Sequence, residues 1–426
     1  MTEETPLAAV IGIDWADQHH DVALEEHASA RVERTRLPHT PEAISGWVAA
    51  LRARFGNRRV GIAVETSRGP LIHALLDHDN VVLYPVNPRS LKRFRETFAP
   101  SGAKDDVPDA DLLRELLAKH RDRLRPWVPD AVELRALRRL VESRRRMVDL
   151  RTQLTLQLTA ALKDYYPQAL TWAGADLSAP LACDFLRKWP TLAAVQRVQP
   201  ARLREFYVTH NCRRPGVIAR RLEEIQHAVP LTRDRAIIEP AVLLVQLLVR
   251  QLKTLAGGLD DFDTEIEQRF AAQADADLFR ALPGSGPALA PRLLVAFGAD
   301  RARFPHPADV QQFSGIAPVL ERSGNSRIVH WRTPAPTFIR QTFHEFANQS
   351  IRYSAWASAY YALQRSRGKS HHTAVRALAF KWIRIIWCCW RQRMSYDEAR
   401  YTRALRQRGA LLATRLTIGD TVVAAA

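Results

Sequence analysis

The chain has 426 residues, with 62 Lys and Arg against 45 Asp and Glu, which gives a formal net charge of +17. This excess disfavours a small neutral substrate and favours a polyanionic partner, because neutralising phosphates releases condensed counterions. The length exceeds what a single core comfortably serves, so we expect two or three domains.

The positive charge is concentrated near the C-terminus. Residues 321–410 hold 17 Lys and Arg and 4 Asp and Glu, which leaves +13 in that stretch.

A membrane is the competing partner for a basic protein, but the sequence has no run of about 18 apolar residues, and the polar start Met1–Pro6 excludes a signal peptide. The four cysteines include an adjacent pair and no C-x-x-C motif. We therefore expect a reduced cytoplasmic protein without disulfides, a zinc site or membrane contact.

Strands and helices alternate in the N-terminal part, which predicts an α/β domain at residues 1–125. Apolar runs or alternating patterns predict strands at Ala8–Asp14, Asp21–Glu26, Arg31–Leu37, Arg59–Glu65 and Val81–Val86. Helical spacing and breaks predict helices at Pro41–Phe55, Leu71–Asp77 and Pro88–Phe98. Thr40 is the expected N-cap of the first helix.

Two of these strands end in a carboxylate. Asp14 closes the first strand and Glu65 closes the fourth, and functional residues of α/β sheets gather at strand ends. Either acid alone is more often the start of a polar turn. A third acidic segment, Lys104-Asp105-Asp106-Val107-Pro108-Asp109-Ala110, precedes a predicted helix in which Asp106 can be the N-cap.

The order strand-acid, strand-acid, helix-acid-acid favours a divalent metal site. Asp106 and Asp109 are three residues apart, so both can point the same way from the helix. Converging carboxylates repel one another unless a cation lies among them, and an all-oxygen ligand set suits Mg²⁺ or Mn²⁺. The alternative, acids that complement a helix N-terminus, accounts for about two of them and leaves the strand ends unexplained.

Two long helices are predicted in the middle of the chain. Asp130–Tyr165 contains no Gly or Pro, and Pro240–Ala272 is expected to be a second helix, split by Gly257-Gly258. They can pair as an antiparallel hairpin or form a dimer seam. We place a helical spacer at residues 126–275, with a helical insert of unassigned role at about 167–231.

Residues 276–410 are predicted to form an all-α domain, followed by a tail at 411–426. The turn Leu282–Pro287 is similar to that of a helix-hairpin-helix element, whose backbone N–H groups can hold a phosphate. Aromatic-rich helices are expected at Thr337–Arg367 and Ser370–Arg393, with most of the aromatic side chains in the core.

A polar segment in this domain carries the main candidate nucleophile, Ser323. It reads Glu321-Arg322-Ser323-Gly324-Asn325-Ser326-Arg327 and is expected to be an exposed loop. Arg322 and Arg327 can offset the charge of a phosphate that a serine attacks, although a Ser-Gly pair by itself is ordinarily a turn. Ser314 is the reserve candidate, but its position near an apolar helix end is more typical of packing.

Several cations of this chain are expected to contact nucleic acid because they lie in polar or loop-like segments. They are Lys104, Arg322, Arg327, Arg332, Arg365, Arg367 and Lys369. The neighbouring His371 and His372 are better suited to phosphate or solvent than to a metal, because adjacent side chains on a helix diverge.

Taken in order, the acidic motifs resemble those of the RuvC-like DEDD transposases of the insertion-sequence-110 type, a family that includes bridge-RNA-guided serine recombinases and the Piv invertases. The matching segments are Ile11–Asp14, Val64–Thr66 and Lys104–Ala110, the last for the family's K-x-D-x-x-D-A element. By this resemblance the catalytic acids and metal ligands are Asp14, Glu65, Asp106 and Asp109, while Asp105 occupies the variable position. A shift of one residue would pair Asp105 with Asp109 instead.

The C-terminal part resembles the family's transposase domain. Gly315-Ile316-Ala317-Pro318 corresponds to a G-L-x-P segment that precedes the nucleophilic serine, so Ser323 is the match. The chain departs from the family after this serine, where His330–Pro336 replaces a K-x-G-N-x-x-L-R stretch. The resemblance implies a ribonuclease-H-like N-terminal fold, a coiled-coil spacer, and Mg²⁺-dependent DNA cleavage and exchange through a phosphoserine intermediate. It further implies a structured guide RNA and a homodimer or homotetramer with composite active sites.

Three other functions are alternatives for this sequence. Sugar kinases and actin-like ATPases share the Ile-Gly-Ile-Asp strand, but Trp15-Ala16-Asp17-Gln18 stands here in place of their Gly/Thr-rich phosphate turn. A RuvC-like structure-selective nuclease or junction resolvase would use metal-activated water and need no serine. A non-catalytic nucleic-acid-binding protein would show no site-specific dependence on a divalent cation.

Overall fold

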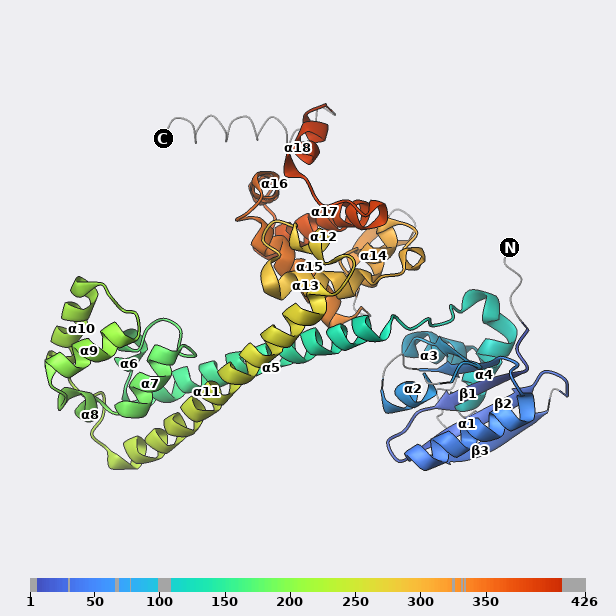
Figure 1. Ribbon diagram of the computed structural model, residues 1–426, viewed down its shortest axis with the longest axis horizontal. Helices are drawn as coiled ribbons and strands as arrows, with labels where there is room; N and C mark the ends of the chain where they lie inside the picture. The colour runs from blue at the N-terminus through green and yellow to red at the C-terminus, as the bar shows by residue number, and fades with distance from the viewer. Residues whose placement is uncertain are drawn as a thin grey trace. The chain divides into compact units, whose positions relative to one another are not determined.

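The computed structural model describes residues 6–29, 31–65, 69–76, 78–98, 109–323, 326–330, 332 and 335–407. The chain forms two compact units, Met1–Pro129 and Asp130–Ala426. Figure 1 labels their elements in chain order. The first unit contains a five-stranded sheet, and the second is mainly helical.

The first unit is built on a mixed sheet of order β3-β2-β1-β4-β5. The strands are β1 (Ala9–Asp14), β2 (His19–Glu26), β3 (Val32–Pro38), β4 (Val60–Val64) and β5 (Val81–Pro85). β1 pairs antiparallel with β2 and parallel with β4. The five predicted strands are confirmed, and this mixed α/β unit fits a ribonuclease-H-like domain.

Helices cover both faces of the sheet, as the alternation of side chains along the buried strands requires. They are α1 (Pro41–Phe55), α2 (Pro70–Leu75), α3 (Pro88–Phe98) and α4 (Asp109–His120), followed by the 3-10 turn η1 (Arg121–Arg123). One core joins Ile11 and Ile13 of β1 to α1 and α2. A second core, on the other face, joins Ala63 and Tyr84 to Leu91 of α3 and to α4.

Strand β1 and helix α4 approach each other unusually closely at Gly12. A Cβ built on Gly12 would lie 1.9 Å from the backbone oxygen of Ala110 and 2.4 Å from the backbone nitrogen of Arg114. Backbone atoms cannot rotate out of the way as a flexible side chain can. Only glycine therefore permits this packing, which sets where α4 begins relative to the end of β1.

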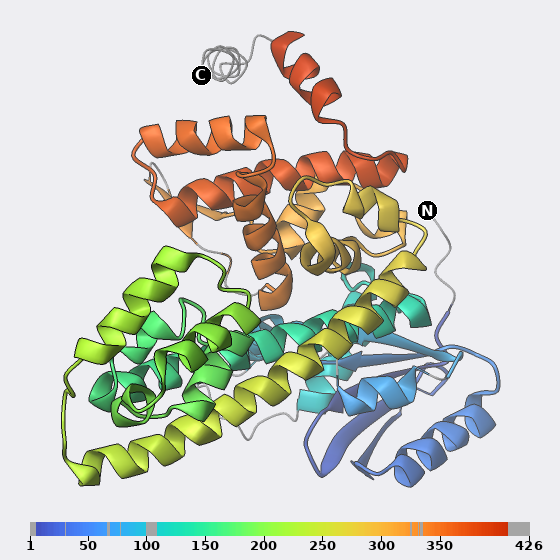
Figure 2. The ribbon, with the colours of Figure 1, turned by 60° about the vertical axis from the view of Figure 1, so that its left-hand side comes forward.

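The second unit begins with two long helices, α5 (Val132–Tyr165) and α11 (Arg235–Ala271). They lie side by side, with α5 leading into the insert and α11 returning from it (Figures 1 and 2). The predicted start of the second helix at Pro240 and its split at Gly257-Gly258 were both wrong, because α11 runs through all three residues. Each glycine costs about 1 kcal/mol relative to Ala, and burial of residues such as Leu252 and Leu259 on either side offsets that cost.

Five short helices form the predicted helical insert between α5 and α11. They are α6 (Ala169–Trp172), α7 (Pro180–Lys188), α8 (Leu192–Gln196), α9 (Pro200–Thr209) and α10 (Pro215–His227). Their core includes Tyr166, Phe185 and Tyr207, and it continues onto Val245 and Leu248 of α11. The insert is therefore packed onto the helix pair and is not a loose loop.

The C-terminal part of the second unit is helical around an aromatic core. Its helices are α12 (Ala276–Arg280), α13 (Gly286–Phe297), α14 (Pro307–Phe313), α15 (Thr337–Ser350), α16 (Ala355–Ser366), α17 (His371–Gln392) and α18 (Glu398–Gln407), with the 3-10 turn η2 (Arg301–Arg303). Trp356, Trp382 and Trp390 are fully buried, as expected for aromatic side chains at helical spacing.

Two predictions for this part were wrong. It is not all-α, because β6 (Val319–Ser323) and β7 (Ser326–His330) form an antiparallel hairpin where a loop was expected. The predicted helix Thr337–Arg367 is two helices, since Ser354 caps a new helix by accepting a hydrogen bond from the Ala357 backbone N–H. The tail at 411–426 lies outside the described residues.

Two further predictions concern cysteines and membranes. All four cysteines are free, as expected for a reduced protein. Among the described residues, α11 is long and apolar enough to cross a membrane by length and composition, a test that core helices of soluble proteins also pass. In the second unit α11 buries Val245, Val249 and Leu252 against its neighbours.

The close contact at Gly12 predicts a large loss of stability in Gly12→Ala. The added methyl group must push α4 away from β1, so we expect the free energy of unfolding of the first unit to fall by about 3 kcal/mol in denaturant melts of the full chain. Gly46→Ala is the matched control, because no atom lies within 4 Å of its added Cβ in the exposed face of α1. That control should be neutral or stabilising by up to about 1 kcal/mol, and a loss equal to that of Gly12→Ala would contradict the explanation.

Candidate active site

Three of the predicted acids come from elements that end or begin at the same edge of the sheet. Asp14 is the last residue of β1, and Glu65 directly follows β4. These strands are parallel neighbours with Ile13 opposite Val64, so the two acids are the next positions in register. Asp109 is the first residue of α4, the helix that packs on β1.

Electrostatic interactions link these acids. Burial raises the pKa of Asp14, and the negative charges of Asp109 and Asp21 raise it further. Burial likewise raises the pKa of Glu65, with added contributions from Asp109 and Asp14. The charge of Asp109 thus disfavours the ionisation of both Asp14 and Glu65, as expected for nearby acids with no cation between them.

Two charged residues of this site were missed by the sequence analysis. Asp21 lies opposite Asp14 in the antiparallel pair of β1 and β2, a neighbour that the strand pattern alone could have indicated. Arg95 of α3 forms an ion pair with Asp109 and lowers the pKa of both Asp14 and Glu65. Its helix was predicted at Pro88–Phe98, but which of the arginines on that helix reaches the acids depends on how α3 packs.

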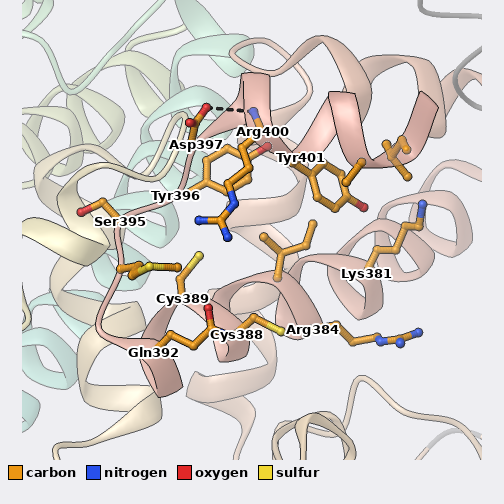
Figure 3. A pocket seen from close by; sticks show the side chains of 14 residues that line it. Lys381, Arg384, Cys388, Cys389, Gln392, Ser395, Tyr396, Asp397, Arg400 and Tyr401 are labelled. Carbon is orange, nitrogen blue, oxygen red and sulfur yellow. Dashed lines mark hydrogen bonds between the residues drawn. The ribbon is translucent and has the colours of Figure 1, made fainter. Parts of the chain in front are cut away.

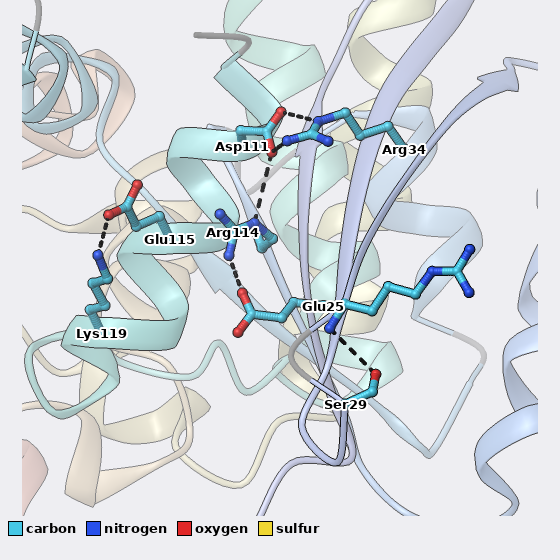
Figure 4. A network of polar contacts seen from close by, with 8 residues as sticks. Glu25, Ser29, Arg34, Asp111, Arg114, Glu115 and Lys119 are labelled. Carbon is cyan, nitrogen blue, oxygen red and sulfur yellow. Dashed lines mark hydrogen bonds and ion pairs between the residues drawn. The ribbon is translucent and has the colours of Figure 1, made fainter.

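An ion network around the buried Asp111 fixes α4 on the sheet just beyond these acids (Figure 4). Asp111, only 5% exposed, accepts two hydrogen bonds from Arg34 of β3, at 2.9 and 3.0 Å. One turn further along α4, Arg114 pairs with Glu25 of β2. The network therefore ties α4 to β2 and β3, and it holds Asp109 at the end of β1.

The remaining acids of the predicted set lie outside the described residues, as does Lys104. They are Asp106 and its alternative, Asp105. Within the described part, no group of three His, Cys, Asp or Glu side chains is close enough to hold a metal ion. The donor set of Asp14, Glu65 and Asp109 is nonetheless entirely carboxylate, which fits a hard divalent cation, and their mutual repulsion is the condition that such a cation would relieve.

The candidate nucleophile lies in the second unit, at the end of a strand. Ser323 is the last residue of β6 and is paired with Ser326 at the start of β7, and Arg322 is paired with Arg327. The predicted exposed loop is therefore the tip of a hairpin. The reserve candidate Ser314 is fully buried, and its hydroxyl donates to the Gln311 carbonyl oxygen at 3.2 Å, which is a packing role.

The base of this hairpin borders a pocket of about 470 Å³ next to α17. Val329, Lys369 and Arg376 are among its lining residues. Arg376 donates hydrogen bonds to the carbonyl oxygens of Ile316 and Gly315, so it ties the segment before β6 to α17.

Most of the remaining cations that were expected to contact nucleic acid lie near one another. Arg365, Arg367 and Lys369 are exposed at the turn between α16 and α17, where Arg365 donates to the Lys369 carbonyl oxygen at 2.8 Å. Arg332 is half-buried after β7. The described residues therefore place a patch of positive charge near the base of the serine hairpin.

A second pocket, of about 490 Å³, lies between α17 and α18 (Figure 3). Cys388 and Cys389 both line it. Burial raises the pKa of Cys389 to about 11, so its thiol stays protonated at neutral pH and is a poor nucleophile.

Comparison with known proteins identifies the family. A transposase family model matches residues 11–167, which include Asp14, Glu65 and Asp109, and the model described as transposase IS116/IS110/IS902 family matches residues 276–362, which include Ser323. The two models together cover more than half of the chain. The chain belongs to the IS116/IS110/IS902 transposase family. As a transposase of an insertion sequence, it is a protein that acts on DNA.

Full-length relatives of this transposase support the same assignment. The chain is 29% identical over 423 residues to a protein of the IS117 mini-circle of Streptomyces coelicolor that is named as a transposase, covering 96% of this chain and 100% of that protein. It is 25% identical to a 42 kDa protein of IS900 from Mycobacterium paratuberculosis, over 92% and 98% of the two chains. It is 24% identical to a 44.8 kDa protein of IS116 from Streptomyces clavuligerus, over 91% and 96%.

Crowding of carboxylates predicts that Asp14→Asn stabilises the metal-free transposase and abolishes its response to Mg²⁺. The substitution removes a charge that Glu65 and Asp109 repel, so thermal unfolding without metal should shift upward by one to a few degrees. The wild-type protein should gain stability with added Mg²⁺, because a ligand that binds only the folded state stabilises it. Asp79→Asn, at an exposed turn before β5, is the control and should keep the wild-type Mg²⁺ response. An equal response in Asp14→Asn would contradict the shared site.

The raised pKa values of Asp14 and Glu65 also predict a pH dependence. In the folded chain both acids hold protons at a pH where the unfolded chain has lost them, so their contribution to stability grows as pH falls through the raised pKa values and is lost above them. Because protons compete with the cation, Mg²⁺-induced stabilisation should decline on acidification at a higher pH than for ordinary carboxylates. Thermal unfolding with and without Mg²⁺ across pH 4–8 measures both trends, and a Mg²⁺ response that is flat down to pH 4 would contradict them.

Proposed function

We propose that this transposase cleaves and exchanges DNA strands through a covalent phosphoserine intermediate, with Ser323 as nucleophile and a carboxylate site that binds a divalent cation. The single observation that carries the proposal is the convergence of Asp14, Glu65 and Asp109 at one edge of the sheet, where Asp109 raises the pKa of both other acids and Asp14 raises the pKa of Glu65. Carboxylates with a purely structural role are ordinarily paired with cationic side chains. Here Arg95 forms an ion pair with Asp109, yet the pKa values of Asp14 and Glu65 remain raised.

The carboxylates would hold Mg²⁺ or Mn²⁺, with Asp106 completing the set and Asp105 as its alternative. When bound, the cation would offset the negative charge of the scissile phosphate and orient it. The protein's own contribution is to fix the acids in place through the packing of α4 on β1 and the Asp111 network. Arg95 would keep the site from carrying the full charge of its carboxylates before the cation and DNA bind.

In the proposed step, the hydroxyl oxygen of Ser323 attacks the scissile phosphorus. A bond forms between that oxygen and phosphorus, the bond from phosphorus to one deoxyribose oxygen breaks, and the serine proton ends on the departing oxygen. The phosphodiester is exchanged and not hydrolysed, so a deoxyribose hydroxyl of another strand can later attack the phosphoserine and reseal DNA without ATP. Arg322 and Arg327, which flank Ser323 in sequence, would stabilise the charge on phosphorus-bound oxygens.

We propose that DNA runs along the basic surface near the serine hairpin. Arg332, Arg365, Arg367 and Lys369 would contact its phosphates, as would Lys104 of the first unit. The turn between α12 and α13 would add a backbone contact of the helix-hairpin-helix type, since Gly284 and Gly286 both have positive φ there.

The proposal includes an assembly of two or four copies and a structured guide RNA that selects the DNA sites, as the family resemblance implies. The carboxylates belong to the first compact unit and Ser323 to the second, and in a composite active site they would come from different protomers. A coiled-coil role for α5 and α11 is part of this proposal. Exposed leucines on α11, Leu243, Leu244 and Leu247, support it.

Removal of the serine hydroxyl distinguishes a recombinase with a serine nucleophile from a nuclease that uses metal-activated water. The transposase is incubated with Mg²⁺, a DNA carrying the element's ends, and the RNA transcribed beside the gene, and the products are resolved on a denaturing gel before and after protease digestion. We expect Ser323→Ala to lose the covalent protein–DNA adduct by at least 100-fold, together with strand exchange. Ser326→Ala, its partner across the hairpin, is the matched control and should keep the adduct.

The outcomes distinguish the candidate functions. Cleavage that persists in Ser323→Ala without an adduct would identify a water-using nuclease. Loss of all products in Asp14→Asn with DNA binding intact is expected for both enzymes. A wild-type protein that binds DNA but gives neither cleavage nor adduct under these conditions would favour a non-catalytic nucleic-acid-binding protein.

A further inference from the structure

The helical insert carries a basic pocket that the proposed chemistry does not use. The pocket has a volume of about 830 Å³ and is formed by residues from the end of α7 to the end of α9, within the insert helices seen in Figure 2. Lys188, Arg197 and Arg202 line it, together with the neutral polar side chains of Gln199 and Thr209. All five of these residues are exposed.

The three cations of this pocket are not neutralised within the described part of the chain. No ion pair there involves Lys188, Arg197 or Arg202. The Lys188 ammonium lies 5.0 Å from the centre of the Phe206 ring, a contact that orients the charge without cancelling it. Glu205 is the one acid among the lining residues, which leaves the pocket with an excess of two positive charges.

The next acid along, Asp184 of α7, cannot supply the missing negative charge because it already has cationic and polar neighbours. Lys253 lies 2.8 Å from one of its oxygens, and Arg187 lies 3.5 Å from the same oxygen. The imidazole of His210 lies 3.1 Å from the other oxygen. The excess charge of the pocket therefore faces solvent.

The floor beneath these cations is rigid. Trp189 and Phe206 pack edge to face with ring centres 4.9 Å apart, and Trp189 also contacts the buried Phe185 at 5.4 Å. Phe206 is buried in the core of the insert. Cations placed on a packed floor lose less conformational freedom on binding an anion than cations on a mobile loop.

We propose that this pocket binds the phosphodiester backbone of a nucleic acid, as a contact of the insert that is distinct from the carboxylate site. Its volume is much larger than a single phosphate, and its opening to solvent admits a continuous chain. Three cations and neutral hydrogen-bonding groups suit successive phosphates, and nothing in the lining indicates readout of one particular base. The backbone belongs either to duplex DNA or to a structured RNA, which share this chemistry.

The test compares two triple variants of the full-length protein in EDTA, so that binding is measured without cleavage and independently of the proposed function. Fluorescence anisotropy gives the Kd for a labelled 30-base-pair DNA duplex and for an RNA hairpin of similar length, across 50–300 mM KCl. In Lys188→Ala/Arg197→Ala/Arg202→Ala, we expect Kd to rise about tenfold or more at 150 mM KCl for at least one probe. The slope of log Kd against log salt should also fall by about two to three.

Arg204→Ala/Arg213→Ala/Arg220→Ala is the matched control, because it removes the same charge from exposed arginines of the insert that do not line the pocket. Its Kd should change less than threefold. The probe that loses affinity identifies the source of the phosphates as DNA or RNA. Equal losses of affinity in both variants would show that only the overall positive charge matters. Unchanged affinity for both probes would mean that the pocket binds another partner, such as an acidic protein. Either result would overturn the proposal.

Discussion

The contact between Gly12 and helix α4 is the constraint on which the candidate active site depends. Carboxylates repel one another, so no attraction among Asp14, Glu65 and Asp109 brings them together. They are held by the backbone: β1 and β4 are parallel neighbours, and α4 lies so close to β1 that a methyl group at Gly12 would overlap the Ala110 oxygen. The stability of the sheet thus offsets the electrostatic cost of the site.

The ion pairs around α4 divide into two groups with different effects. Asp111 and Arg114 form ion pairs with Arg34 on β3 and Glu25 on β2, and these pairs hold the helix in place. Arg95 instead joins Asp109 and reduces the repulsion among the acids without removing it, since the pKa values of Asp14 and Glu65 remain raised. The ion pairs thus hold α4 on the sheet while part of the repulsion among the acids remains.

Local pattern predicted most of the first unit. Apolar runs gave the five strands, and Thr40 as N-cap with Pro41 in the first turn gave the start of the first helix. The predicted split of the second long helix was wrong because tertiary packing outweighs the local effect of glycine. Helix α11 continues through Gly257 and Gly258, since residues on either side of them are buried. The hairpin around Ser323 was overlooked, although β-branched residues on both sides of Ser323–Ser326 were a usable signal. Asp21 could have been inferred from the antiparallel pairing of the first two predicted strands, whereas Arg95 could not be assigned to the site without the packing of α3.

The central claim is that Asp14, Glu65 and Asp109 bind one divalent cation. Anomalous diffraction from crystals of the full chain soaked in Mn²⁺ tests it most directly, because the signal locates the metal without reference to activity. The account predicts a Mn²⁺ peak within about 2.0–2.6 Å of carboxylate oxygens from all or most of these acids. A well-ordered site with the three side chains resolved and no peak among them, at Mn²⁺ concentrations that support DNA cleavage, would contradict it.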